Sequence, residues 1–141
     1  MQRLTAVFVF VAALLLPFDD ARAQMPTGTY PGMLDCAQLP FTKGPQRAAV
    51  QFRVERDKVT YSRTVKNENN TAAVGTETGN GTIAADGATS LTGGWRGSRD
   101  SYSASYSGRL SAKGGKLGGQ QNWTYKGQSY TRVSAITVSG R

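Results

Sequence analysis

The sequence predicts an all-β protein, built as a single antiparallel up-and-down barrel or flattened sandwich of about eight strands. Two patterns carry this prediction. Apolar and polar residues alternate with a period of two through most of the chain after residue 24, as in half-buried strands. Gly, Asn and Asp interrupt this alternation about every ten residues, as turns between short strands do. No segment after the first 23 residues has the apolar stripe of a helix. We expect the first and last strands to pair and close the sheet.

The first 23 residues predict a secretory signal peptide. Arg3 provides a positive start, residues 4–16 are almost uninterruptedly apolar, and residues 21–23 supply the small side chains that a signal peptidase reads. The apolar run is shorter than the roughly 20 residues that a membrane-spanning helix needs. We therefore expect cleavage before Gln24, which leaves a β domain of residues 24–141 that is periplasmic or secreted, with no transmembrane span.

The first half of this domain predicts a strand that contains Cys36, followed by a hairpin. Residues 50–54 and 59–65 alternate regularly on either side of a polar turn at residues 55–58. Residues 71–78 predict a weaker strand, which ends at the turn-forming sequence Gly79-Asn80-Gly81.

The second half predicts a continuous meander. Asp86-Gly87 is a strong two-residue hairpin signal, because glycine tolerates the positive φ that such turns require. Turns are expected at residues 97–100, 113–116 and 126–128. They separate strands over residues 88–95, 101–110, 117–125 and 130–138. Glycines inside these strands, at 93, 94, 118 and 119, indicate tight curvature or bulges.

The cysteine and histidine content excludes several kinds of metal and catalytic site. Cys36 is the only cysteine and the chain has no histidine. A single thiol cannot form a disulfide within one chain, so Cys36 is either buried or available to another molecule, and burial is favoured. Zinc sites of the Cys and His type are excluded, and so are the Ser-His-Asp and Cys-His arrangements of hydrolases.

The carboxylates also argue against an enzyme. Most of them fall in predicted turns, where Asp commonly caps backbone amides. A catalytic pair of Glu68 and Glu77 is the alternative, but surface and turn roles are favoured for both. The sequence also lacks a glycine-rich phosphate loop between a strand and a helix. We expect no enzymatic activity, no metal site and no cofactor.

The positive charge is concentrated in one half of the domain. The chain has a formal net charge of +8, and residues 87–141 hold eight Lys and Arg against the single acidic residue Asp100. Such a field favours anionic glycans or lipid headgroups, whereas nucleic acid is not expected as a partner of an exported protein. The alternative is that scattered charges only keep the protein soluble.

Aromatic and cationic residues alternate in the same half, and together they can bind an anionic glycan or lipid headgroup. The candidate binding residues are Trp95, Arg96, Arg99, Lys126, Tyr130 and Arg132. In the alternative interpretation the aromatic side chains form the core while the cations face water. The alternation favours this alternative for Tyr102, Tyr106, Trp123 and Tyr125, because the opposite faces of their strands are rich in Ser, Gln or Thr.

Four short motifs resemble a set of uncharacterised exported β domains of proteobacteria. They are Gly28-Thr29-Tyr30 before the Cys36 strand, Gly81-x-Ile83-x-x-Asp86-Gly87, Tyr102-x-Ala104-x-Tyr106-x-Gly108-x-Leu110, and Arg132 two residues before a usual cysteine. The resemblance implies that an early and a late cysteine join the first and last strands. Here Ser134 stands at the late position. The resemblance implies no catalytic residue.

These observations predict a non-enzymatic exported binding module, whose basic C-terminal half contacts an anionic component of the cell envelope. Two alternatives stay open: a barrel that carries an apolar ligand, and a structural or adhesive envelope protein. A small eight-stranded barrel can fill its interior with side chains or hold one small ligand. The state of the interior therefore separates a carrier from a surface binder.

Overall fold

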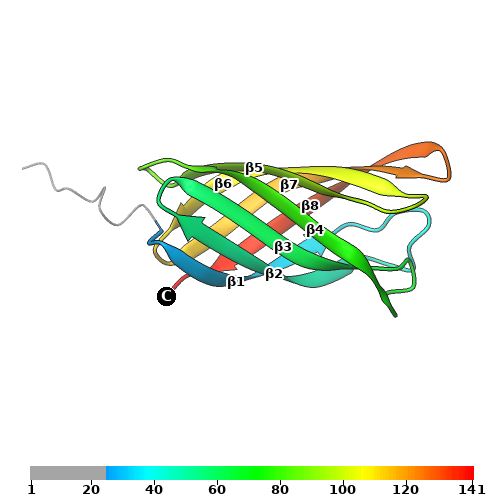
Figure 1. Ribbon diagram of the computed structural model, residues 1–141, viewed down its shortest axis with the longest axis horizontal. Helices are drawn as coiled ribbons and strands as arrows, with labels where there is room; N and C mark the ends of the chain where they lie inside the picture. The colour runs from blue at the N-terminus through cyan, green and yellow to red at the C-terminus, as the bar shows by residue number, and fades with distance from the viewer. Residues whose placement is uncertain (1–24) are drawn as a thin grey trace, which may run out of the picture.

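The computed structural model describes residues 25–141 (Figure 1). The predicted signal peptide, residues 1–23, lies outside these described residues. Eight antiparallel strands follow one another as a meander, and β1 pairs with both β2 and β8, so that the sheet closes into a barrel. The strands are β1 (Gly28–Cys36), β2 (Gln46–Glu55), β3 (Lys58–Lys66), β4 (Ala73–Ile83), β5 (Ala88–Arg96), β6 (Ser101–Ser111), β7 (Gly114–Tyr125) and β8 (Gln128–Ser139). The all-β prediction is thus confirmed, and the architecture is the barrel.

The alternation of the sequence explains why these strands close around a core. In β2, Val50, Phe52 and Val54 are buried while the residues between them are exposed. The hairpin turns follow local sequence in the same way. Lys126 and Gly127 join β7 to β8 with φ values of 49° and 76°, which suits the two-residue turns that match strand twist.

Two predicted turns are placed differently in the structure. The segment Gly79-Asn80-Gly81 lies inside the long strand β4 and forms no turn. Gly79 pairs directly with Gly93 of β5, and a Cβ atom added to either residue would overlap the ring of Tyr61. These glycines therefore make room for a tyrosine rather than bend the chain. The predicted turn at residues 113–116 is shorter than expected, because β7 already begins at Gly114.

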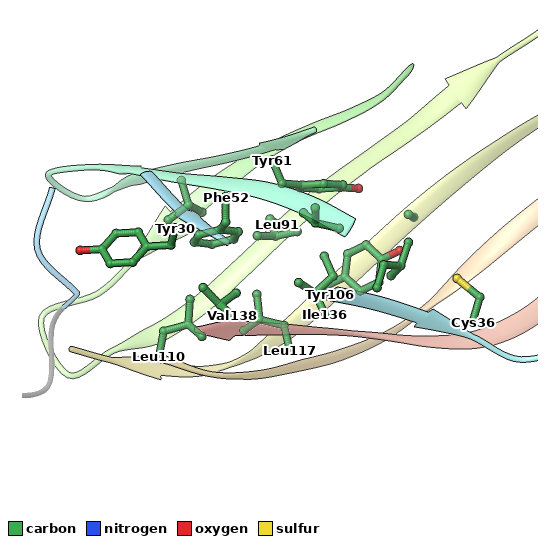
Figure 2. Close-up of a cluster of buried hydrophobic side chains, with 14 of the residues drawn as sticks. Tyr30, Cys36, Phe52, Tyr61, Leu91, Tyr106, Leu110, Leu117, Ile136 and Val138 are labelled. Carbon is green, nitrogen blue, oxygen red and sulfur yellow. The ribbon is translucent and has the colours of Figure 1, made fainter. Parts of the chain in front are cut away.

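One end of the barrel is filled with apolar side chains, and both the start of β1 and the C-terminus lie there (Figures 1 and 2). We call it the closed end and define it by its buried residues Tyr30, Phe52, Val54, Val59, Ile83, Leu91, Leu110, Leu117, Ile136 and Val138. Figure 2 shows seven of these side chains gathered together, with Cys36 set apart from them: Tyr30, Phe52, Leu91, Leu110, Leu117, Ile136 and Val138. Met25 is itself buried and packs with this cluster.

The opposite end, which we call the open end, carries the connections β1–β2, β3–β4, β5–β6 and β7–β8, and the β7–β8 hairpin extends furthest there (Figure 1). The barrel wall is incomplete on this side. β2 pairs with β3 only over Gln51–Glu55, whereas residues 46–50 pair with β1 alone and residues 63–66 with β4 alone. The two strands thus separate toward the open end.

Candidate functional site

A pocket of about 540 Å³ lies at the open end of the barrel. Four aromatic side chains line it, and we call them the aromatic cup: Phe41, Trp95, Trp123 and Tyr125. Phe41 stacks on Tyr125 with 3.9 Å between ring centroids and meets Trp123 edge-on at 5.7 Å. The two tryptophan rings lie 6.3 Å apart. The cup therefore offers ring faces and edges at the mouth of a β-barrel, where small-molecule sites commonly occur.

Strand register brings the rings of the cup together. Trp95 of β5, Tyr102 of β6 and Trp123 of β7 are direct neighbours in the sheet and all face inward. Tyr102 stacks on Trp123 with ring centroids 4.3 Å apart. Gly75 of β4 makes room for Trp95, because a Cβ atom there would overlap the indole nitrogen. The cup thus draws its residues from β5, β7 and the β1–β2 connection, and Tyr102 of β6 lies between Trp95 and Trp123 and supports them.

A buried ion pair inside the barrel connects β3, β4 and β6. Arg63 forms a salt bridge with Glu77, whose side chain is fully buried. The Tyr61 hydroxyl donates to Glu77 Oε1 at 3.0 Å, and Arg63 Nη2 donates to the Tyr102 hydroxyl at 2.8 Å. Burial, and next the nearby Glu77, raise the pKa of Tyr61 and Tyr102 far above the usual range. Both tyrosines are therefore neutral, and the carboxylate of Glu77 has a donor on each oxygen.

Arg132 of β8 is a second buried cation, only 3% exposed. Its Nε donates to Gln121 Oε1 at 2.8 Å, and its Nη1 donates to Gln46 Oε1 at 2.8 Å and to the Ala37 carbonyl at 3.3 Å. Its Nη2 is buried and has no hydrogen-bond partner. Within residues 25–141, no carboxylate forms an ion pair with this guanidinium. Burial lowers the pKa of Arg132.

Gln121 ties Arg132 to the aromatic residues. Its Oε1 also accepts a hydrogen bond from Trp123 Nε1 at 3.0 Å, and its Nε2 donates to the Tyr106 hydroxyl at 3.2 Å. The Arg132 Cζ lies 5.3 Å from the Trp123 ring centroid, in the range of a cation–π contact. Burial, more than Glu77, raises the pKa of Tyr106 to about 12.

The structure brings together part of the predicted binding set. Trp95, Arg99 and Lys126 line the pocket, and the Tyr130 ring packs on Phe41 with 5.3 Å between centroids. Arg132 points into the barrel rather than to the surface, whereas Arg96 is exposed and does not line the pocket. The aromatic residues for which the alternation favours a core position are placed as follows: Tyr102, Tyr106 and Trp123 are buried, and Tyr125 is half-buried in the cup.

The preference for a surface or turn role of Glu77 is wrong, because Glu77 lies inside β4 and is fully buried. Sequence reasoning also missed the interior residues Arg63 and Gln121, together with Gln46 and Phe41 at the mouth. The alternation along the strands held a signal for Arg63 and Gln121. Arg63 lies two residues after Tyr61 in β3, and Gln121 lies two residues before Trp123 in β7. Each therefore points to the same face of its strand as the aromatic residue. Phe41 carried no such signal, because it lies in the β1–β2 connection rather than in a strand.

Cys36 is buried, as the sequence favours. Its direct partner across the β1–β8 closure is Ser134. The Ala37 amide donates to the Val133 carbonyl at 2.9 Å, so Cys36 and Ser134 form the neighbouring non-hydrogen-bonded pair. Such pairs have Cα atoms about 4.5 Å apart, within the range that disulfides span.

Across the part of the chain that the structure describes, no helix is long and apolar enough to cross a membrane. In residues 25–141, no three His, Cys, Asp or Glu side chains cluster as metal ligands would.

No protein-family model and no curated protein matches this chain. The resemblance to exported β domains stays a prediction.

Proposed function

We propose that this protein is a non-enzymatic binding protein, which holds one small, flat, largely apolar ligand in the aromatic cup. The observation that carries the proposal is the pocket of about 540 Å³ at the open end, lined by Phe41, Trp95, Trp123 and Tyr125. This volume is typical of sites for small organic molecules, and aromatic walls with a few polar groups are typical of their lining. The proposal develops the carrier alternative, with the ligand at the mouth of the barrel.

The contrast with the closed end supports a binding role for the cup. Apolar side chains already fill the closed end, so the fold has a core without the cup. Trp95 and Tyr125 are only half-buried, and they leave ring surface in contact with water. Apolar surface grouped in a concavity is favourable to cover, and a flat ligand would cover it.

The charged residues around the pocket favour a ligand with a negative group. Lys66, Arg99 and Lys126 line it together with the acidic Glu68 and Asp100. Tyr125 engages Glu68 through a hydrogen bond of 2.7 Å, which reduces the negative charge that this carboxylate presents. Contact with an anionic envelope component, in the periplasm or outside the cell, would use the same cations. Its test is salt-sensitive binding to anionic liposomes, which should weaken after charge reversal at Arg99.

The test of the cup uses the chain's own fluorophores. The protein has two tryptophans, and both line the pocket, so a bound ligand should change the intrinsic tryptophan fluorescence. We expect saturable changes with naphthamide, an uncharged flat aromatic probe. Native mass spectrometry of gently purified protein should also show a retained small molecule.

A matched pair of variants locates the binding. Phe41→Ala removes a wall of the cup and should weaken naphthamide binding about tenfold, whereas Val133→Ala trims an outward-facing side chain that is 72% exposed and should have no effect. If the fluorescence does not respond to naphthamide and no retained molecule is found, the proposed function is wrong.

A further inference from the structure

We propose that the ligand of the cup is an aromatic carboxylate, and that its carboxylate displaces the Gln46 side chain to bind Nη1 and Nη2 of Arg132. This inference rests on the proposed function and adds the chemical class of the ligand. It follows from the hydrogen bonds of Arg132, from the charge inside the barrel and from the position of Gln46.

The donors of Arg132 are incompletely used. A guanidinium has five N–H donors in a rigid fork. Arg132 uses three of them, on Gln121, Ala37 and Gln46, and both hydrogens of its buried Nη2 lack a partner. A buried donor without a partner is costly, and native structures seldom tolerate one without a reason. A carboxylate accepts two parallel hydrogen bonds from one end of the fork.

The charge inside the barrel is also unbalanced. Arg63 and Glu77 neutralise each other in their ion pair, whereas Arg132 has no carboxylate partner in the described part of the chain. The thiol of Cys36 is no substitute counterion, because burial raises its pKa and keeps it neutral. An isolated buried charge is strongly unfavourable unless it is paired. A ligand with one negative charge would balance the interior.

Gln46 lies between the cup and Arg132. It is the first residue of β2, it lines the pocket, and its Oε1 accepts the hydrogen bond from Arg132 Nη1. Trp123 likewise lines the pocket and contacts the same guanidinium. A second pocket, of about 260 Å³, lies where β2 and β3 separate, and Gln46 and Trp123 line this one too. If the Gln46 side chain swings away, a group at the floor of the cup meets the free end of the guanidinium.

The experiment compares two probes of the same shape, one anionic and one uncharged. Naphthoate is a flat aromatic carboxylate, and naphthamide is its uncharged isostere. Tryptophan fluorescence titrations should give a dissociation constant about tenfold lower for naphthoate in the native protein, as expected for a charge-assisted pair of hydrogen bonds. Arg132→Met should abolish this preference and leave naphthamide binding within about twofold. Arg109→Met is the matched control: it removes an exposed arginine that does not line the pocket, and it should keep the preference.

A second variant tests the same preference if the Arg132→Met variant does not fold. Gln46→Glu places a carboxylate on the atom position that already accepts from Nη1, at the first residue of a strand. It should pair with Arg132, compete with naphthoate, and remove the preference without loss of naphthamide binding. Equal binding of the two probes by the native protein, or a preference that survives both Arg132→Met and Gln46→Glu, overturns the carboxylate assignment but leaves the cup intact. Failure of both probes to bind overturns the proposed function as well.

Discussion

The two ends of the barrel differ in what fills them. At the closed end, apolar side chains such as Phe52, Leu110 and Leu117 are completely buried and form a packed core. At the open end, aromatic rings surround a pocket, and the interior beneath them holds Glu77 and Arg132. The closed end therefore holds the packed apolar core of the fold, whereas the open end departs from core packing and leaves the pocket in which we propose that a ligand binds.

The largest expected effect is a difference in stability between two Phe→Ala variants, one at each end of the barrel. Phe52→Ala removes a fully buried ring from the closed end, and we expect it to lower the free energy of unfolding by about 3–5 kcal/mol. Phe41→Ala at the open end should cost about 1 kcal/mol, because that ring is only partly buried. Denaturant unfolding of both variants measures the difference. Equal losses of stability would remove the division of roles between the ends.

The next prediction concerns the ion pair beneath the cup. Glu77→Gln leaves the Arg63 guanidinium buried without a counterion, and we expect a loss of about 3 kcal/mol. The double variant Glu77→Leu with Arg63→Met removes both charges and should recover most of this loss, because apolar replacements of a buried pair are often neutral. Thermal and denaturant unfolding measure both. If the single variant unfolds like the native protein, the pair contributes nothing to stability.

The barrel and three of the four cup residues could be predicted from the sequence, and physical reasons separate what could be predicted from what could not. Strand parity and turn residues are local signals, so the hairpins around residues 56 and 86 and the inward positions of Tyr102 and Trp123 were within reach. The role of Gly79 was not, because it depends on a ring from the neighbouring strand β3.

Arg132 illustrates the limit most clearly. Cations normally stay in water, so the sequence places this residue on a basic surface. Arg132 lies on the same face of β8 as Ser134 and Ile136, and this face points into the barrel. Its partners Gln121, Gln46 and Ala37 come from β7, β2 and the end of β1, and only the closed barrel brings them together.

A third prediction concerns the pairing of β1 with β8, which closes the barrel. Ser134→Cys places a thiol directly opposite Cys36, in a non-hydrogen-bonded pair of β1 and β8. Under oxidising conditions we expect a disulfide and a gain of about 2 kcal/mol, less than chain entropy suggests for so long a loop because engineered bridges carry strain. Thiol titration and unfolding with and without reductant measure it. Ser134→Ala, which cannot form a bridge, should show no dependence on reductant. Two free thiols in the oxidised Ser134→Cys protein would contradict the pairing.

The smallest effect is expected at alkaline pH, where tyrosines of the interior and of the cup should behave differently. Burial raises the pKa of Tyr106 to about 12, whereas an unfolded tyrosine ionises near about 10. The native state therefore retains a proton that the unfolded state loses, so stability is fully present below about pH 10 and declines as the pH rises toward about 12. Tyr106→Phe should make this decline shallower in unfolding experiments.

Tyr125 of the cup provides the control, because its raised pKa comes first from the hydrogen bond to the Glu68 carboxylate. It is accessible in the folded protein, so it should ionise without unfolding, and Glu68→Gln should lower its pKa toward the ordinary value. Tyrosinate absorbance follows both groups. An identical pH dependence of unfolding in the native protein and in Tyr106→Phe would contradict the interior assignment. A Tyr125 titration that ignores Glu68→Gln would contradict the assignment in the cup. The two titrations together show whether Tyr106 is sealed inside the barrel while Tyr125 is accessible at its mouth.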